Sequence, residues 1–288
     1  MIKKFLQKVF KTIFYSLFSV IYGKIKETVE TSEDKRIKVD TALLDNKLKY
    51  NIYEITEGRL YTDRIHDTAA ILDNKIINGP SFQERYTQGS DFKIYNSEAK
   101  NNIVLKIGTP RVLRKLNGVV LSLLTGGAGN NNYWHWLYDV LPRIGLCSKS
   151  FNLNDINYYL LPSLIKKFQN ETLDVLKIPK SKRLSSSKYR HIKTKKLIIT
   201  DHPVVVSGNS TLDIQNIPKW IMLWLKKNLI KENIIKNKKV NNKIYIERDF
   251  VSKNKISERS ISNDEEVKNY LLDKGCDVVR LGKLDFQD

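Results

Sequence analysis

The chain of 288 residues exceeds the usual size of one domain, so two lobes or one large α/β domain are expected. Its 41% hydrophobic and 10% aromatic residues exclude a disordered chain, and its 2 cysteines exclude a disulfide scaffold and indicate a reducing, cytoplasmic location. The net charge of +19 comes from lysines scattered among asparagines and isoleucines, without any nucleic-acid-binding signature. We therefore expect no nucleic-acid partner and attribute the charge to compositional bias plus affinity for acidic membranes, anionic glycans or sugar nucleotides.

Residues 1–30 are predicted to form a basic amphipathic N-terminal helix. The longest uncharged stretch, Thr12 to Gly23, has 12 residues, fewer than the roughly 20 that span a bilayer. We interpret residues 1–26 as a helix that lies on the inner face of the cell membrane. A helix docked on the body of the protein is the alternative, and a signal peptide is disfavoured because no small-residue cleavage site follows the apolar part.

After a polar linker at residues 31–40, residues 40–218 are predicted to form an N-terminal α/β lobe. Strands are expected at Asn51–Tyr61, Ala69–Ile77, Val104–Ile107, Val119–Leu124, Asn157–Pro162 and Lys196–Thr200, and helices at Leu164–Leu176 and Lys219–Ile235. Alternating strands and helices are typical of an α/β protein with largely parallel sheets.

The segment Asn132–Arg143 carries the main functional signal. It follows the apolar run Val119–Leu124 and a glycine-rich stretch, an order that predicts a buried strand, a loop and a helix start. At 3.6 residues per turn, His135, Asp139 and Arg143 fall within roughly 80° of one another, opposite an apolar stripe. The helix is therefore a candidate wall of an active-site cleft. A surface helix with an ordinary i, i+4 His/Asp pair is the alternative.

Residues 240–288 are predicted to begin a C-terminal lobe with one βαβ unit, the building block of nucleotide-binding lobes. Lys243–Arg248 has the pattern of a strand, and Ser262 opens a helix as part of a capping box. Gly275 ends that helix, and Cys276–Leu281 forms the next strand.

Two arginines bracket the first loop of this unit. Arg248 lies at the end of the strand and Arg259 shortly before the helix, where a phosphate is favoured. The planar fork of arginine suits a diphosphate because it binds two oxygens at once. Each arginine is equally well explained as a surface residue in an ion pair.

These motifs together resemble glycosyltransferase family 61, which includes proteins named for capsular polysaccharide biosynthesis. The resemblance rests on Asn132–Arg143, Ile244–Arg248, Ser257–Arg259 and Asn263–Glu266, and it runs from about residue 40 to the end. It implies a GT-B-like architecture of two Rossmann-like lobes. It also implies inverting transfer of a sugar from a nucleotide-sugar donor to a hydroxyl of a glycan or lipid-linked acceptor in polysaccharide biosynthesis.

The implied reaction needs a base for the acceptor hydroxyl and cations for the departing diphosphate. Asp139 is the candidate base, with His135 as the alternative base or its orienting partner. The candidate donor-binding residues are Arg248, Arg259 and Asn263, and the candidate cleft-organising residues are Arg143 and Trp136. No Asp-x-Asp pair occurs in the sequence, so we expect no metal ion, and no cofactor besides the nucleotide-sugar co-substrate.

The chain departs from the family at its end. Family members continue past a segment such as Leu284–Gln287 into a further helix and a His-Gly-Ala-Gly-Leu-Thr-Asn-like stretch, whereas this sequence stops at Asp288. The second lobe is therefore expected to be incomplete, as in a truncated product. A catalytically inactive or scaffolding relative of such an enzyme is the alternative function.

Two other enzyme classes are disfavoured. A dinucleotide-binding oxidoreductase would place a third glycine where Asn132 follows Gly127 and Gly129. A hydrolase would need a Gly-x-Ser-x-Gly elbow, or a cysteine with a nearby histidine, and the sequence offers neither.

Overall fold

The computed structural model describes residues 2–62, 68–81, 83–86, 94–97, 99–124, 132–204, 215–230, 243–247, 263–280, 284 and 286. For residues 2–8, 11, 83–86 and 94–97 it describes the backbone only. The chain divides into two compact units, residues 1–226 and 227–288, and each is described by itself.

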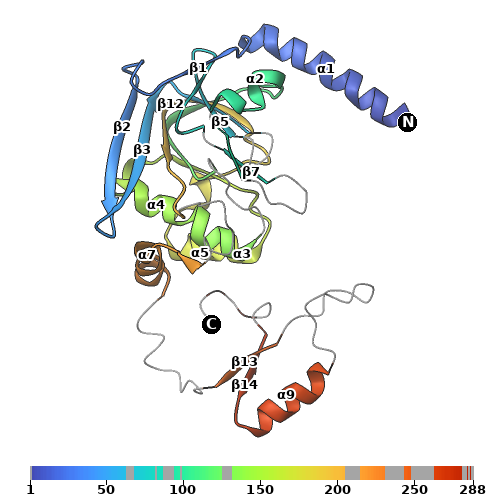
Figure 1. Ribbon diagram of the computed structural model, residues 1–288, viewed down its shortest axis with the longest axis vertical. Helices are drawn as coiled ribbons and strands as arrows, with labels where there is room; N and C mark the ends of the chain where they lie inside the picture. The colour runs from blue at the N-terminus through green and yellow to red at the C-terminus, as the bar shows by residue number, and fades with distance from the viewer. Residues whose placement is uncertain are drawn as a thin grey trace. The chain divides into compact units, whose positions relative to one another are not determined.

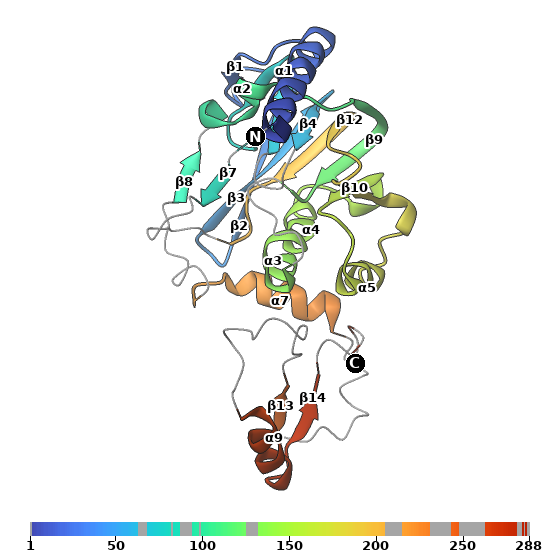
Figure 2. The same cartoon turned by 90° about the vertical axis from the view of Figure 1, so that its right-hand side faces the viewer.

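The first unit is built on a large sheet with helices around it (Figures 1 and 2). Its strands are β1 (Glu27–Val29), β2 (Ile37–Leu44), β3 (Leu48–Thr56), β4 (Arg59–Thr62), β5 (Thr68–Leu72), β6 (Lys75–Ile77), β9 (Arg114–Ser122), β10 (Tyr158–Leu161), β11 (Arg183–Ser185) and β12 (His191–Thr200), beside a separate pair, β7 (Gln83–Tyr86) and β8 (Ile94–Ser97). Its helices are α1 (Ile2–Tyr22), α2 (Val104–Ile107), α3 (Tyr133–His135), α4 (Pro142–Cys147), α5 (Lys167–Val175) and α7 (Lys219–Leu229). Short helical turns are η1 (Ala99–Asn101), η2 (Trp136–Val140), η3 (Leu153–Asp155) and η4 (Lys180–Lys182).

The large sheet confirms the α/β class and is mixed. Strands β12, β9, β10 and β11 are parallel neighbours, as expected for an α/β fold. The strands from β2 to β6 pair antiparallel with one another or with β12. Tight turns with positive φ angles at Asp45–Asn46 and Asp73–Asn74 connect β2 to β3 and β5 to β6, and such turns join antiparallel neighbours.

Two segments predicted between residues 31 and 107 differ from the structure. The prediction of a strand at Val104–Ile107 is wrong, since these residues form α2, whose first N–H donates to the Asn102 side chain at 3.0 Å. A four-residue apolar run cannot distinguish a buried strand from a helical turn. The second half of the predicted linker at 31–40 is also wrong, because β2 begins at Ile37 with a buried side chain.

The core occupies both faces of the sheet. Along β5, Ala70 and Leu72 belong to one buried cluster and Ala69 and Ile71 to another, as the two-residue period of a strand requires. Such double burial makes the strands continuous apolar runs rather than alternating ones. The sheet is therefore a rigid platform for the residues at its edge.

The parallel strands β9 and β12 end at the same edge of the sheet, where Ser122 pairs with Ile199. The helix that begins at Asn132 comes after β9 in the chain, and Asp201 and His202 come directly after β12. Ligands of α/β proteins bind at the carboxyl ends of strands. Helix α4 contacts both β12 and β3, so this edge lies next to the predicted functional helix.

Helix α1 ends at Tyr22, earlier than the predicted residue 30, because Gly23 adopts the left-handed region with φ +83°. The last residue is anchored on the sheet. The Tyr22 hydroxyl accepts a hydrogen bond from the Leu113 N–H at 3.0 Å, and the Tyr22 ring meets His191 edge-on at 5.1 Å. Among the described residues, no helix has the length and apolar character that crossing a bilayer requires.

The second unit contains β13 (Ile244–Ile246), α9 (Asp264–Asp273) and β14 (Asp277–Val279). The two strands are parallel, which confirms the predicted βαβ unit. Gly275 follows α9 with φ +78°, so it ends the helix as expected. Ser262, the predicted first residue of the helix, lies outside the described residues, and Asn263 is the N-cap.

Candidate functional site

The helix at the carboxyl edge begins at Asn132, whose side chain caps it. The Asn132 carboxamide oxygen accepts hydrogen bonds from the N–H groups of Trp134 at 2.9 Å and His135 at 3.4 Å. An N-cap of this kind stabilises the first turn by about 1 kcal/mol. The cap therefore fixes the turn that carries His135, and the predicted helix start is confirmed.

The middle of this helix is a wide π turn, η2. The Leu141 N–H donates to the Trp136 carbonyl five residues earlier, at 3.1 Å. Pro142 supplies the physical reason, because a proline ring clashes with the carbonyl four residues before it and has no N–H to donate. Such π turns are frequent at functional sites.

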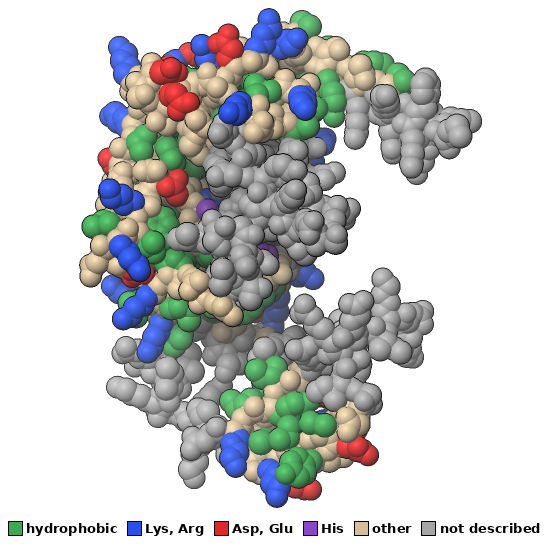
Figure 3. Space-filling view, in the orientation of Figure 1, with side chains coloured by type: hydrophobic (Ala, Val, Ile, Leu, Met, Phe, Trp, Pro, Cys, Tyr) green, Lys and Arg blue, Asp and Glu red, His purple; other side chains and the backbone are tan. Residues whose placement is uncertain are grey.

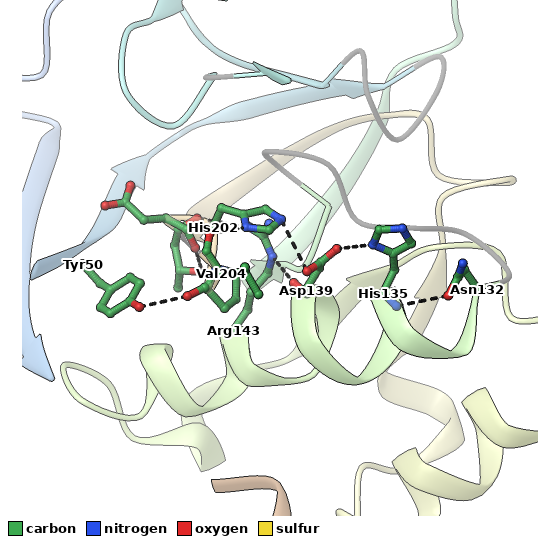
Figure 4. A network of polar contacts seen from close by, with 10 residues as sticks. Tyr50, Asn132, His135, Asp139, Arg143, His202 and Val204 are labelled. Atoms are coloured by element: carbon green, nitrogen blue, oxygen red, sulfur yellow. Dashed lines mark hydrogen bonds and ion pairs between the residues drawn. The ribbon is translucent and has the colours of Figure 1, made fainter. Parts of the chain in front are cut away.

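His135 and Asp139 form a hydrogen-bonded pair on this helix, as Figure 4 shows. Nδ1 of His135 lies 2.6 Å from Oδ2 of Asp139, and the His135 side chain is 40% exposed whereas that of Asp139 is 4% exposed. An ionised carboxylate only accepts, so Nδ1 carries the proton and Nε2 is the nitrogen that can take up another. The hydrogen bond to Asp139 raises the pKa of His135 above its ordinary value of 6.5.

Arg143 is fully buried and joins the helix to the end of β12. Its Nε donates to the Asp139 carbonyl at 2.7 Å, and its Nη1 donates to the Thr200 carbonyl at 3.2 Å. The predicted cleft-organising side chain therefore fixes the distance between two chain segments. A guanidinium suits this task because its donors are arranged in a rigid fork.

His202 comes to the same carboxylate from the end of β12, and sequence reasoning did not single it out. Its Nε2 lies 3.7 Å from Oδ1 of Asp139, and its Nδ1 lies 2.9 Å from the Val204 carbonyl oxygen (Figure 4). The available signal was the polar Asp-His-Pro sequence that follows a buried strand. The strand pairing that brings His202 to Asp139 is not visible in local sequence patterns.

Trp136 is also fully buried, on the side of the helix that faces α5. Its Nε1 donates to Oγ1 of Thr172 at 2.8 Å, and its ring lies 6.4 Å from that of Phe168. Trp136 therefore anchors the helix on α5.

In the second unit, Asn263 occupies the N-cap position of α9 without a capping hydrogen bond from its side chain, and its Nδ2 donates to Oε2 of Glu266 at 3.1 Å. The other two predicted donor-binding residues, Arg248 and Arg259, lie outside the described residues. Glu247, at the end of β13, forms ion pairs with Arg280 and with Lys268, the latter at 3.4 Å. The Arg280 guanidinium lowers the pKa of Glu247 to about 2, so the carboxylate is ionised at neutral pH.

A histidine held by a buried carboxylate lies at the carboxyl edge of the parallel strands, where α/β proteins bind their ligands, and an imidazole in such a pair can take up or release a proton. The profile of the family described as Glycosyltransferase 61 matches residues 133–288, from the first residue of α3 onwards. The match covers more than half of the chain, which therefore belongs to this family and is a glycosyltransferase. No curated protein and no solved structure matches the chain.

Proposed function

We propose that the protein transfers a sugar from a nucleotide-sugar donor to a hydroxyl of a glycan or lipid-linked acceptor in polysaccharide biosynthesis, as in the formation of a capsule. The reaction inverts the anomeric carbon and uses no metal ion. The observation that carries this proposal is the half-exposed His135 imidazole held by the buried Asp139 carboxylate, in a member of a glycosyltransferase family. The lack of an Asp-x-Asp pair supports metal independence.

His135 is the better candidate for the base, and Asp139 for its orienting partner. Asp139 is 4% exposed, and its two oxygens face His135 and His202, so neither oxygen is presented to an acceptor. In the proposed step, the acceptor hydroxyl gives its proton to Nε2 of His135 while its oxygen attacks the anomeric carbon. The bond between that carbon and the diphosphate oxygen breaks, and the electron pair leaves with the nucleoside diphosphate.

The donor site is assigned to the second unit, as one of two Rossmann-like lobes in a GT-B-like arrangement. Its parallel βαβ unit supports this assignment, because such units bind nucleotides at the carboxyl ends of their strands. Arg248 follows β13 and Arg259 precedes α9 in the sequence, and with Asn263 they would hold the diphosphate. The positive charge of the arginines would stabilise the departing group.

Substitution of the pair tests the reaction. The wild-type chain is supplied with a panel of sugar nucleotides and glycan acceptors, and release of nucleoside diphosphate is measured. We expect His135→Gln and Asp139→Asn to lower kcat by roughly 10²- to 10⁴-fold, with donor affinity by calorimetry nearly unchanged. The value of kcat/KM should rise with pH around a midpoint above 6.5, because Asp139 raises the pKa of His135 and the base must be unprotonated.

Lys115→Gln, at the opposite end of β9, is the matched control and should leave turnover unchanged. If His135→Gln keeps full turnover and Asp139→Asn loses it, Asp139 rather than His135 is the base. A chain that binds no sugar nucleotide in the panel would instead favour the scaffolding alternative.

We further propose that α1 holds the enzyme on the inner, cytoplasmic face of the membrane. Large apolar side chains of the helix are exposed, namely Phe10 at 59%, Ile13 at 56%, Phe14 at 47%, Leu17 at 48% and Ile21 at 57%. Figure 3 shows hydrophobic side chains, in green, at the surface of the described part of the molecule. The spacing of three and four residues between these apolar side chains of α1 places them on one face, as a stripe. Lysines but no acidic residues occur in α1, which favours an anionic lipid surface as the partner.

A further inference from the structure

We propose that His202 is a positioning residue that acts on His135 through Asp139, as a cation held at the second oxygen of the shared carboxylate. This inference deepens the proposed function, since it rests on His135 being the base. Two groups would then set the pKa of His135, namely Asp139 on the same helix and His202 at the end of β12.

The hydrogen bonds of His202 define where its protons lie. Nδ1 is 2.9 Å from the Val204 carbonyl oxygen, which can only accept, so Nδ1 carries a proton. Nε2 therefore faces Oδ1 of Asp139, at 3.7 Å. An unprotonated Nε2 would direct a lone pair at a carboxylate oxygen, which repels it, whereas a protonated Nε2 attracts that oxygen. The geometry thus favours an imidazolium beside Asp139.

Asp139 can accept the interaction because, among the described residues, its second oxygen has no hydrogen-bond donor. Oδ1 is buried and receives no hydrogen bond from the described residues, while Oδ2 is taken by His135. A buried carboxylate oxygen without a partner is costly, and a nearby cation offsets that cost. The 4% exposure of the Asp139 side chain leaves little access for water.

Among the described residues, the charged neighbours of His202, namely Asp201 and Arg143, have other hydrogen-bond partners. Asp201, its neighbour in the chain, accepts hydrogen bonds from the Asn51 N–H at 2.7 Å and from the Tyr53 hydroxyl at 3.1 Å. Burial raises the pKa of Asp201, while the charge of Arg143 opposes this effect. Arg143 binds the carbonyl oxygens of Asp139 and Thr200, so it holds the backbone on both sides of the contact.

The consequence concerns the proton affinity of His135. A positive charge at His202 repels the proton that His135 would take up, and so opposes the attraction of that proton to the Asp139 carboxylate. The positive charge of His202 therefore limits how far Asp139 raises the pKa of His135, and keeps the base unprotonated nearer to neutral pH. The contact sets base strength without touching the acceptor.

Nuclear magnetic resonance of the imidazole groups tests this coupling without any sugar nucleotide, so its failure is distinct from failure of the proposed function. The chain has 4 histidines, so each signal can be assigned by substitution. We expect His202→Asn and His202→Gln to raise the pKa of His135 by about one unit, because both remove the charge. Asn keeps a donor toward Val204, and Gln places an amide donor toward Asp139, so each variant preserves one of the native contacts.

The signal of His191 is the internal control, since burial lowers the pKa of that ring to about 4 and it should titrate equally in all variants. In activity measurements, both variants should shift the acidic limb of kcat/KM to higher pH by the same amount. An unchanged His135 pKa in both variants would overturn the proposal. A rise in His202→Asn alone would also overturn it, because a hydrogen bond rather than a charge would then be responsible.

Discussion

At the scale of single residues, His191 is a fully buried ring whose two nitrogens both have partners. Nδ1 donates to the Arg111 carbonyl oxygen at 2.9 Å, and the Arg59 guanidinium lies 3.1 Å from Nε2. Nε2 must therefore be unprotonated and accept from the cation. Burial lowers the pKa of His191 to about 4, because a second positive charge beside Arg59 would be desolvated and repelled.

This pair predicts a loss of stability in acid. The folded-state pKa lies below the unfolded value of about 6.5, so the unfolded chain takes up the proton first as the pH falls. The contribution of His191 to the free energy of unfolding is therefore complete above about pH 6.5. It falls by about 3 kcal/mol as the pH is lowered to about 4. The free energy of unfolding, measured in urea, should differ less between pH 7 and pH 4.5 for His191→Gln than for the wild type. An equal difference in the two proteins would contradict the assignment.

At the scale of elements, α4 and α7 approach closely at Gly145. A Cβ at this position would lie 2.7 Å from Nε1 and 2.8 Å from Cδ1 of Trp224, closer than packed atoms allow. We expect Gly145→Ala to destabilise the first unit by about 1–3 kcal/mol through overpacking, although alanine favours a helix by about 1 kcal/mol. Chemical denaturation measures the change. In a Trp224→Leu background the same substitution should be neutral or stabilising, and an equal loss in both backgrounds would refute the steric explanation.

The elements also explain which parts of the fold and site could be predicted. The pair His135 and Asp139 was predictable because i, i+4 spacing is local to one helix, and the βαβ unit was predictable from its glycine and its strands. Arg143 was expected on the side of the helix that lines a cleft, but it is buried against the end of β12. His202 was missed for the same reason, since its position follows from the pairing of β9 and β12 rather than from neighbouring residues.

At the scale of the whole molecule, the net charge of +19 and the exposed stripe of α1 predict binding to anionic membranes. The full chain should sediment with vesicles that contain an anionic phospholipid, and less with vesicles of neutral lipid. Each lysine near such a surface contributes about 1 kcal/mol, and salt screens this attraction. Binding should therefore weaken as the ionic strength rises.

Substitution of the stripe separates insertion from simple charge attraction. We expect a chain with Phe10→Ser, Phe14→Ser and Leu17→Ser to bind anionic vesicles at least roughly 10-fold more weakly, because each apolar side chain contributes about 1.5 kcal/mol or more when buried in lipid. The matched control replaces Val112, Ile165 and Met222 with serine, since these apolar side chains are at least as exposed but lie outside α1. Both variants keep every lysine, so a difference between them reports the apolar stripe. Equal vesicle binding by the two variants would contradict a membrane role for α1 and leave the general positive charge as the cause of any binding.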